Sequence, residues 1–236
     1  MTGGRHQYTI QAKPRPIVFG ADETAVLVID MQNDFGAAGG MFDRAGIDIS
    51  GIRRVVEPTR KVLQAAREAG LPIVYLTMEY EPDLSNLGAP GTPNRRLHEW
   101  FGVGQTVVNP DGRRGRVLIK GTWNTAVIDE LAPQARDTIV SKHRYSGFFE
   151  TRLDAVLQEL GAKCLVVTGC TTSVCVESTI RDAMFRGYDC ILLSDCSAEP
   201  IGANLPRSNH EATLLSIETL FGSVSDAGSF IDALRG

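Results

Sequence analysis

Residues 24–30, TAVLVID, form an almost unbroken run of apolar and β-branched residues that ends in a carboxylate. Runs of the same character recur at residues 72–77, 138–141, 164–168 and 190–194. A strand that is buried on both faces has such a continuous apolar run, whereas a half-exposed strand alternates between apolar and polar residues. The five runs therefore predict interior strands of one sheet.

Helical patterns lie between these runs, at residues 52–69, 151–160, 174–185 and 211–220, and the last of them is expected to close the chain. Gly70, Gly161 and Gly187 follow the first three patterns, as is typical of helix ends. Strands that alternate with helices favour a parallel sheet, because parallel neighbours need crossover connections. The predicted fold is α/β, a three-layer, Rossmann-like, doubly wound parallel sheet of about six strands.

Two segments stand outside this alternation. Residues 1–22 are polar, contain Pro14 and Pro16 and show no period, so they are interpreted as an arm in front of a single domain over residues 23–236. Residues 81–123 are rich in proline and glycine and are expected to form an irregular insert, with a short helix at 95–101 and a strand near 117–119. Inserts of this length are usually functional or disordered.

The composition excludes several classes of function. With 24 Lys and Arg against 28 Asp and Glu, the chain lacks the basic excess of a nucleic-acid-binding protein. The longest apolar runs are far too short to cross a bilayer and residues 1–20 lack a signal-peptide pattern, so no membrane association and a cytoplasmic location are expected. The five cysteines are odd in number and form no CxxC pair, which predicts free thiols.

Reactive side chains follow three of the predicted strands. Asp30 ends the first run, Lys142 follows the run at 138–141, and Cys175 comes after the run at 164–168 through a short turn. Ligands of open parallel sheets bind at the carboxyl ends of the strands, so these three residues are expected to converge.

Cys175 is expected in the opening turn of a helix, with Thr172 or Ser173 as the N-cap. Free N–H groups and the helix dipole at such a position stabilise a thiolate and can bind an oxyanion. Asp30 would then accept the thiol proton and Lys142 would hold the negative charge. Packing remains an alternative for Cys175, and it is the preferred reading for the other four cysteines.

Further candidates lie in loops near the predicted cleft. Phe35, Tyr80 and Trp123 could clamp a planar group, and Asn33 and Tyr145 could hydrogen-bond to a substrate, although core packing explains each of them almost equally well.

The four histidines offer weaker readings. His143 would give a Cys–His pair, but neighbours on a strand point to opposite sides, which disfavours it beside Lys142. His6, His98 and His210 lack a companion at metal-ligand spacing and are interpreted as solvent or packing residues.

Three stretches now show a resemblance to a known family: VIDMQNDF (28–35), KHRYSGFF (142–149) and VTGCTTSVCVESTIRDA (167–183). They resemble the isochorismatase-like cysteine hydrolase superfamily. Within it, the likeness is greatest to the ureidoacrylate amidohydrolases of pyrimidine breakdown, through GGMFDRAGIDIS (39–50), GAPGTPN (88–94), KGTWN (120–124) and FGSVSD (221–226). The resemblance implies a catalytic triad of Asp30, Lys142 and Cys175. It also implies a cis peptide bond before Thr171 and an oxyanion hole made by the N–H groups of Thr171 and Cys175.

Some residues depart from the family patterns. The related nicotinamidases carry a metal-binding Asp and two His after the second strand, but TMEYEPDL (77–84) has no His, so no metal or other cofactor is expected. Met78 and Tyr80 stand near positions where the ureidoacrylate enzymes would have Asn and Trp, and KGTWN replaces a KGSWD-like stretch, which leaves the substrate open. Isochorismatase itself lacks the cysteine, so Cys175 favours an amide or carbamoyl substrate.

The function implied is a metal-independent cysteine amidohydrolase that cleaves the carbamoyl (ureido) C–N bond of a small substrate such as ureidoacrylate through a covalent acyl-enzyme. The alternatives are biuret, triuret or N-carbamoylsarcosine as substrate, or a noncatalytic binding domain with the same pocket. Which C–N bond breaks is open, and Arg144, Arg95 and Arg96 are candidates to bind a substrate carboxylate. A homodimer or homotetramer is expected from the family, with the insert and the arm as interface elements.

Overall fold

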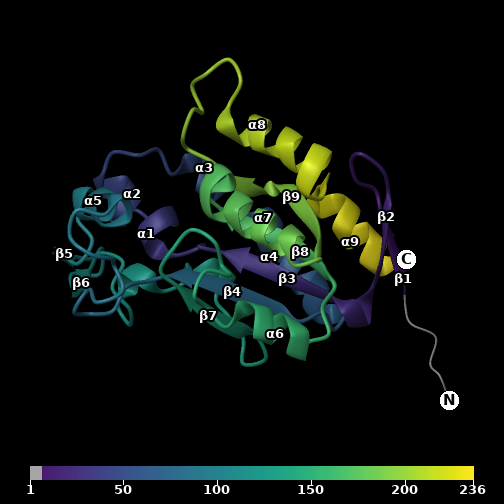
Figure 1. Cartoon of the computed structure of the whole chain (residues 1–236), viewed down its shortest axis with the longest axis horizontal. Helices are drawn as coiled ribbons and strands as arrows, with labels where there is room; N and C mark the ends of the chain where they lie inside the picture. Colours follow the sequence, from purple (N-terminus) through teal and green to yellow (C-terminus); the bar gives the residue numbers. More distant parts are fainter. Residues whose placement is uncertain (1–6) are drawn as a thin grey trace.

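The computed structural model describes residues 7–236. Its centre is a six-stranded parallel sheet in the order β10-β9-β8-β3-β4-β7 (Figure 1). The strands are β3 (Thr24–Ile29), β4 (Ile73–Met78), β7 (Thr138–Lys142), β8 (Cys164–Cys170), β9 (Asp189–Ala198) and β10 (Ser223–Ser225). All five predicted runs are strands, and the predicted fold class is confirmed.

Helices cover both faces of the sheet (Figure 1). One face carries α3 (Ser50–Arg54), α4 (Val56–Glu68) and α9 (Ala227–Arg235), and the other carries α6 (Leu153–Glu159), α7 (Glu177–Phe185) and α8 (Asn209–Ser216). Strand β3 contributes to both cores: Val26 and Val28 pack on the α4 side, whereas Leu27 and Ile29 pack on the α7 side. This explains why its sequence is apolar without alternation.

Helix boundaries differ from the predicted ones where capping or packing decides them. The pattern at 52–69 forms two helices that meet at Val55, and those at 174–185 and 211–220 include single π-helical turns, η4 (Thr172–Val176) and η5 (Ile217–Phe221). The expectation that the last pattern closes the chain is wrong, because β10 and α9 follow it. Helix α9 contains Gly228 and Ser229, which are weak helix formers, and the Asp226 cap and the buried Phe230 stabilise it.

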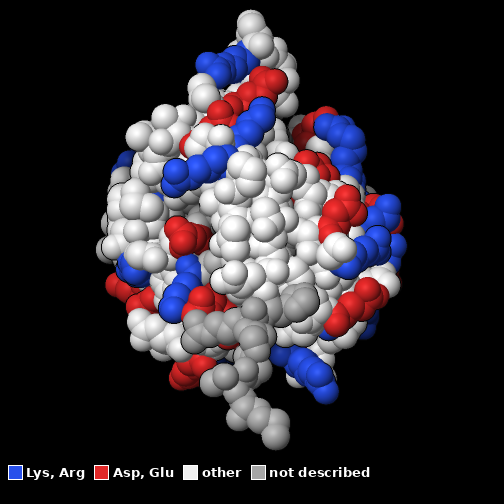
Figure 2. Space-filling model, turned by 90° about the vertical axis from the view of Figure 1, so that its right-hand side faces the viewer, with Lys and Arg blue, Asp and Glu red and all other residues white. Residues whose placement is uncertain are grey.

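The amino-terminal segment is more regular than expected. Strands β1 (Gln7–Ile10) and β2 (Ile17–Gly20) form an antiparallel hairpin, and residues 1–6 lie outside the described part. Tyr8, Ile10 and Phe19 are buried, and Phe19 stacks on Phe230 of α9 with 6.1 Å between the ring centres. Exposed and buried residues alternate along QYTI (7–10), as they do on a strand with one buried face, and the prediction missed this alternation. On this side of the molecule, charged side chains of both signs surround an uncharged centre (Figure 2).

The insert gathers at the end of the sheet where β3 and β4 finish (Figure 1). It contains the expected helix, α5 (Pro93–Trp100), and an antiparallel pair, β5 (Thr106–Val108) and β6 (Arg114–Arg116). The expected strand near 117–119 is wrong, because Ile119 makes only a single bridge with Tyr80.

Two short helices and three 3-10 turns complete the elements of the described chain. They are α1 (Asn33–Gly36), α2 (Met41–Arg44), η1 (Ala21–Glu23), η2 (Trp123–Thr125) and η3 (Asp129–Leu131). No helix within residues 7–236 is long and apolar enough to cross a membrane.

Candidate active site

Asp30 follows β3 directly and is held by its backbone. It has a positive φ of 53°, its N–H donates to the Leu76 carbonyl over 2.9 Å, and its own carbonyl accepts from Cys170 Sγ at 3.1 Å. Gly169, with φ of 121°, makes this approach of β8 to β3 feasible, because a Cβ there would lie 2.0 Å from the Ile29 carbonyl oxygen. The turn is thereby fixed so that the carboxylate stands at the end of the sheet.

Lys142 is the last residue of β7 and reaches Asp30 beside β4. Its Nζ lies 2.7 Å from Asp30 Oδ2, 3.3 Å from the Arg144 carbonyl oxygen and 3.6 Å from Met78 Sδ. Both charged side chains are fully buried, with 0% and 1% of their surfaces exposed. Removal of either partner of a buried ion pair destabilises the fold, because it leaves an uncompensated charge in the interior.

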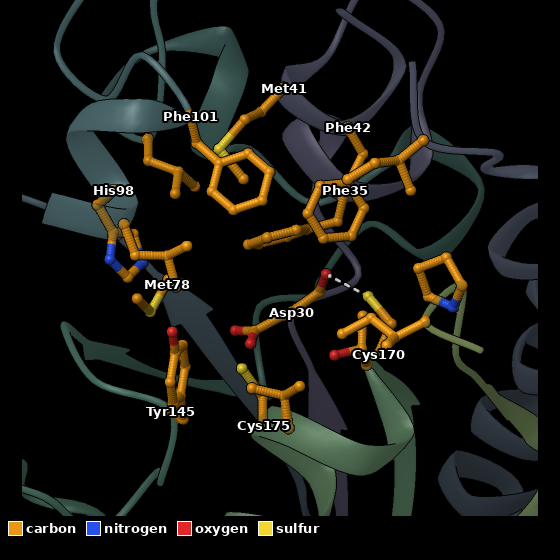
Figure 3. Close-up of a pocket in the computed structure, with 17 residues that line it drawn as sticks. Asp30, Phe35, Met41, Phe42, Met78, His98, Phe101, Tyr145, Cys170 and Cys175 are labelled. Carbon is orange, nitrogen blue, oxygen red and sulfur yellow. Dashed lines mark hydrogen bonds between the residues drawn. The ribbon is translucent and has the colours of Figure 1, made fainter. Parts of the chain in front are cut away.

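Cys175 lies in the η4 turn that precedes α7, and its sulfur points toward the Asp30 carboxylate (Figure 3). The peptide bond between Cys170 and Thr171 is cis. The predicted N-cap is wrong: Thr171 occupies that position, without a side-chain cap. Thr172 and Ser173 lie inside the turn, because Val174 and Val176 both donate to the Thr171 carbonyl.

The side chains of this turn bind to the end of β9, to the loop after it and to His210 of α8. Glu199, which is 8% exposed, accepts from the Ser173 N–H at 2.8 Å and from the Ser173 hydroxyl at 2.5 Å. The Thr172 hydroxyl contacts Ser197 Oγ at 2.7 Å and His210 Nδ1 at 3.0 Å. These contacts fix the first turn that carries Cys175.

Burial dominates the electrostatics of the three residues. It raises the pKa of Asp30 above its ordinary 3.8, and the nearby Lys142 ammonium opposes this only in part. Burial alone would lower the pKa of Lys142, but the charges and hydrogen bonds of Asp30 and Cys175 together outweigh burial, so the pKa is raised. Burial and then the negative charge of Asp30 also raise the pKa of the Cys175 thiol. Desolvation and the Asp30 charge therefore oppose the thiolate that a helix start is expected to favour.

A cavity of about 280 Å³ opens above Cys175 (Figure 3). It lies between the insert, the carboxyl ends of the strands and the loop after β9. Its lining residues are Asp30, Phe35, Met41, Phe42, Ile47, Met78, Leu97, His98, Phe101, Leu118, Tyr145, Cys170, Thr171, Val174, Cys175, Pro200 and Ile201. Among residues 7–236, no group of three or more His, Cys, Asp or Glu side chains is arranged to hold a metal ion.

The structure brings together only some of the predicted binding residues. Phe35 and Tyr145 line the cavity, but Asn33, Tyr80 and Trp123 do not. The Asn33 amide donates to the Trp123 carbonyl over 2.8 Å, which closes the loop behind the wall. Tyr80 is fully buried with its ring edge-on to His98, at 5.3 Å between ring centres.

None of the three candidate arginines lines the cavity. Arg95 pairs with Glu99 at 2.7 Å, Arg96 donates to the Gly91 carbonyl, and Arg144 donates to the Asn86 carbonyl over 3.0 Å.

The histidines are placed differently from one another. His143 lies 3.2 Å from Glu150 and does not line the cavity, which removes the basis for a Cys–His pair, and His6 lies outside the described residues.

His98 is a site residue that the sequence analysis missed. Its Nδ1 lies 2.7 Å from the Asn94 carbonyl oxygen, one helical turn earlier, so Nδ1 carries the proton. Burial lowers the pKa of His98, which keeps the ring neutral and leaves Nε2 as an acceptor. The residues Leu97, His98 and Phe101 recur at helical spacing in the insert and all line the cavity, so this pattern could have identified α5 as a wall.

Comparisons with known proteins agree with this geometry. The model of the isochorismatase domain family matches residues 24–229. The chain is 40% identical over 232 residues to a ureidoacrylate amidohydrolase of Methylorubrum extorquens strain AM1, covering 98% of this chain and 91% of that protein.

Solved structures are similar over most of the chain. A cysteine hydrolase from Pseudomonas syringae pv. phaseolicola 1448A has a TM-score of 0.78 and 29% identity, covering 99% of each chain. An N-carbamoylsarcosine amidase from Thermoplasma acidophilum has a TM-score of 0.63 and 28% identity, covering 87% of this chain and 96% of that one.

Proposed function

The chain belongs to the isochorismatase family of hydrolases, and we propose that it is a metal-independent cysteine amidohydrolase that cleaves the C–N bond of a small ureido or carbamoyl compound. Ureidoacrylate, which the 40% identical relative is named for, is a member of that substrate class. One observation carries the proposal: Cys175 stands at the cavity floor, pointing toward a buried carboxylate that an ammonium holds at 2.7 Å. A nucleophile, a base and an orienting cation are then present in one cavity.

The first half of the reaction forms an acyl-enzyme. Asp30, whose raised pKa makes it a better base, accepts the proton of the Cys175 thiol, and the thiolate attacks the ureido carbonyl carbon. The N–H groups of Thr171 and Cys175 stabilise the oxyanion. In support, the Thr171 N–H has no protein acceptor within residues 7–236. The C–N bond then breaks as Asp30 returns the proton to the departing nitrogen, leaving a thioester-like adduct on Cys175.

The second half restores the enzyme. Asp30 takes a proton from a water molecule, the resulting hydroxide attacks the adduct carbonyl, and the Cys175 sulfur leaves and regains a proton. Lys142 keeps its proton throughout, because the charges around it raise its pKa, and it holds the Asp30 carboxylate in place. The products are carbamate and an amine if the substituted nitrogen leaves, or ammonia and a substituted carbamate if the terminal nitrogen leaves.

Ammonia release by the metal-stripped protein tests the proposal, with ureidoacrylate, biuret, triuret and N-carbamoylsarcosine as substrates. Because carbamate decomposes to ammonia, the assay detects cleavage of either C–N bond. We expect Cys175→Ala to lose activity and keep its thermal unfolding midpoint. Cys164→Ala is the matched control, since Cys164 is a buried free thiol outside the cavity. No release from any of the four substrates would contradict the proposal and favour a noncatalytic binding domain.

We also propose that the protein works in a reducing compartment such as the cytoplasm. We propose in addition that it forms a homodimer or homotetramer. The support for the first is that all five cysteines are free, although Cys164 and Cys190 lie on paired neighbouring strands. The support for the second is the set of exposed large apolar side chains, which includes Trp100 at 74%, Phe185 at 69% and Leu220 at 67%. Light scattering of the purified protein would reveal a monomer if the assembly is wrong.

A further inference from the structure

His98 lines the cavity from α5 and has one ring nitrogen without a partner. Its Nδ1 lies 2.7 Å from the Asn94 carbonyl oxygen, and no other group within residues 7–236 forms a hydrogen bond with the ring. Because Nδ1 points back to its own helix, the free polar atom that His98 brings to the wall is Nε2, at the distal end of the ring. The side chain is 5% exposed, so a molecule that binds Nε2 there is largely removed from water.

Tyr145 lies between His98 and the reactive residues. The centre of its ring is 6.1 Å from that of His98, and burial and then the charge of Cys175 raise its pKa. Figure 3 shows the Tyr145 hydroxyl between the His98 ring and the side chains of Asp30 and Cys175. When the ureido carbonyl of a short linear substrate is at Cys175, the other end of that substrate can therefore reach His98.

Positive charge reaches His98 from behind the wall, although no lysine or arginine of the described chain lines the cavity. Burial lowers the pKa of His98 most, and the charges of Arg144 and Lys142 lower it further. Asp30 compensates Lys142 at 2.7 Å. Arg144, in contrast, donates to two backbone carbonyls and pairs with no acidic side chain within residues 7–236. This end of the cavity therefore has a positive potential, which attracts an anionic group.

The other groups around the His98 ring keep their charge near neutral pH. Tyr80 meets the ring edge to face at 5.3 Å between centres, and burial raises its pKa to about 12. Burial raises the pKa of Tyr145 as well, so both phenols stay protonated. On α5 itself, Arg95 and Glu99 pair with each other at 2.7 Å. Within the described chain, His98 is thus the group at this end of the cavity whose charge can change between pH 6 and pH 8.

We propose, on the premise of the proposed function, that His98 binds the carboxylate of a ureido acid and becomes protonated as it does so. Nε2 takes up one proton from solvent and donates it in a hydrogen bond to a carboxylate oxygen, while the Nδ1 proton stays on the Asn94 carbonyl. The imidazolium compensates the substrate charge, because an opposite charge at hydrogen-bond distance favours the charged form of a histidine. Ureidoacrylate, which the 40% identical relative is named for, is an acid of this kind.

Replacement of His98 by Gln tests this assignment with two acids, ureidoacrylate and 3-ureidopropionate, and with N-(3-methylbutyl)urea, in which an isopropyl group replaces the carboxylate of the second acid. We expect His98→Gln to lower kcat/KM at least about 10-fold for the acids and less than about 3-fold for the uncharged compound, because only the acids lose a charge-assisted hydrogen bond. His143→Gln is the matched control, since His143 lies 3.2 Å from Glu150 and outside the cavity. Thermal unfolding verifies that both variants fold.

The pH dependence distinguishes a charged role of His98 from a packing role. The ratio of kcat/KM for 3-ureidopropionate to that for N-(3-methylbutyl)urea cancels the titration of the triad. We expect this ratio to fall by up to about 10-fold per pH unit from pH 6 to pH 8, because the ring must take up a proton to bind the acid, and to stay constant in His98→Gln. Calorimetry of ureidoacrylate binding to Cys175→Ala, in buffers of different ionisation enthalpy, should show proton uptake that the double variant His98→Gln/Cys175→Ala lacks.

The outcomes separate the two proposals. Cys175-dependent hydrolysis of the acids that His98→Gln leaves unchanged, or lowers as much as that of the uncharged compound, overturns the inference and leaves the proposed function standing. A constant ratio in the wild type or hydrolysis of uncharged compounds alone overturns it as well. If the wild type hydrolyses the acids alone, the absence of proton uptake overturns it. Hydrolysis of neither these compounds nor biuret, triuret or N-carbamoylsarcosine removes the proposed function, and the inference with it.

Discussion

Replacement of Lys142 by Met isolates the role of the buried ion pair. The substitution keeps most of the apolar side chain and removes the ammonium that lies 2.7 Å from Asp30 Oδ2. Asp30 then stays 1% exposed without its cationic partner, and at pH 7 it must either remain charged in the interior or take up a proton. Protonation is the less costly response, so the carboxyl becomes neutral and loses its ability to accept the thiol proton.

The cost of that protonation follows from the ordinary pKa. Protonating a carboxyl of pKa 3.8 requires about 4 kcal/mol at pH 7 and about 2 kcal/mol at pH 5, since each pH unit corresponds to about 1.4 kcal/mol. Because the pKa of Asp30 in the folded variant is raised further, the defect is absent below pH 3.8 and grows as the pH rises. In the double variant Asp30→Asn/Lys142→Met no charge is left unpaired, and we expect it to lose only about 1–2 kcal/mol.

Urea unfolding followed by tryptophan fluorescence at pH 5 and pH 7 measures these differences, and ammonia release measures activity. We expect Lys142→Met to lose about 10³-fold or more in kcat/KM, as removal of general base catalysis predicts. If Lys142→Met unfolds within about 1 kcal/mol of the wild type at pH 7, or loses the same amount at both pH values, the ion pair does not hold Asp30 in its charged form and the reasoning fails.

Two further predictions concern residues around the site. Asp34 is fully buried, accepts from the N–H groups of Met41 and Leu118 and from the Asn124 amide, and burial raises its pKa to about 6. The contribution of Asp34 to stability is therefore full below pH 3.8 and is lost as the pH rises through about 6. Between pH 4 and pH 7, the unfolding free energy of the wild type should fall by up to about 3 kcal/mol relative to that of Asp34→Asn. A difference that stays constant over this range would contradict the raised pKa. Glu199→Ala removes the acceptor that joins Ser173 to the Ile201 N–H, so we expect KM to rise about 10-fold with a smaller change in kcat. The control is Glu218→Ala, because Glu218 is half-buried and does not line the cavity; an unchanged KM in Glu199→Ala would show that this contact does not shape the cavity.

Much of the architecture was accessible from local sequence patterns. The five apolar runs predicted the interior strands, and the rule that ligands bind at the carboxyl ends of parallel strands placed Asp30, Lys142 and Cys175 at one edge. Among the elements that were missed, β1, β2, β10 and α9 are short or contain weak formers, and contacts with distant residues stabilise them. Phe19 on Phe230 is an example in which two segments more than 200 residues apart in the sequence support each other.

The sequence did not predict which loop side chains line the cavity. Asn33, Tyr80 and Trp123 are near the site along the chain, yet their side chains turn into the packing behind it, whereas His98, Met41 and Phe42 reach the cavity. The direction of a loop side chain depends on which buried donors and acceptors the loop must satisfy. The Asp34 carboxylate is such an acceptor, because it binds the Met41 N–H, the Leu118 N–H at the end of the insert and the Asn124 amide.

The sequence by itself determined the sheet, the order of its predicted strands along the chain and the convergence of the three reactive residues, since each follows from period, length and strand direction. Only the tertiary structure decided the protonation of those residues and the chemistry of the wall. Burial together with the mutual charges of Asp30, Lys142 and Cys175 sets their pKa values. The absence of an arginine or lysine from the cavity within residues 7–236 depends on contacts with Glu99, Gly91 and Asn86. Desolvation and hydrogen-bond satisfaction are properties of the folded interior, and no local pattern encodes them.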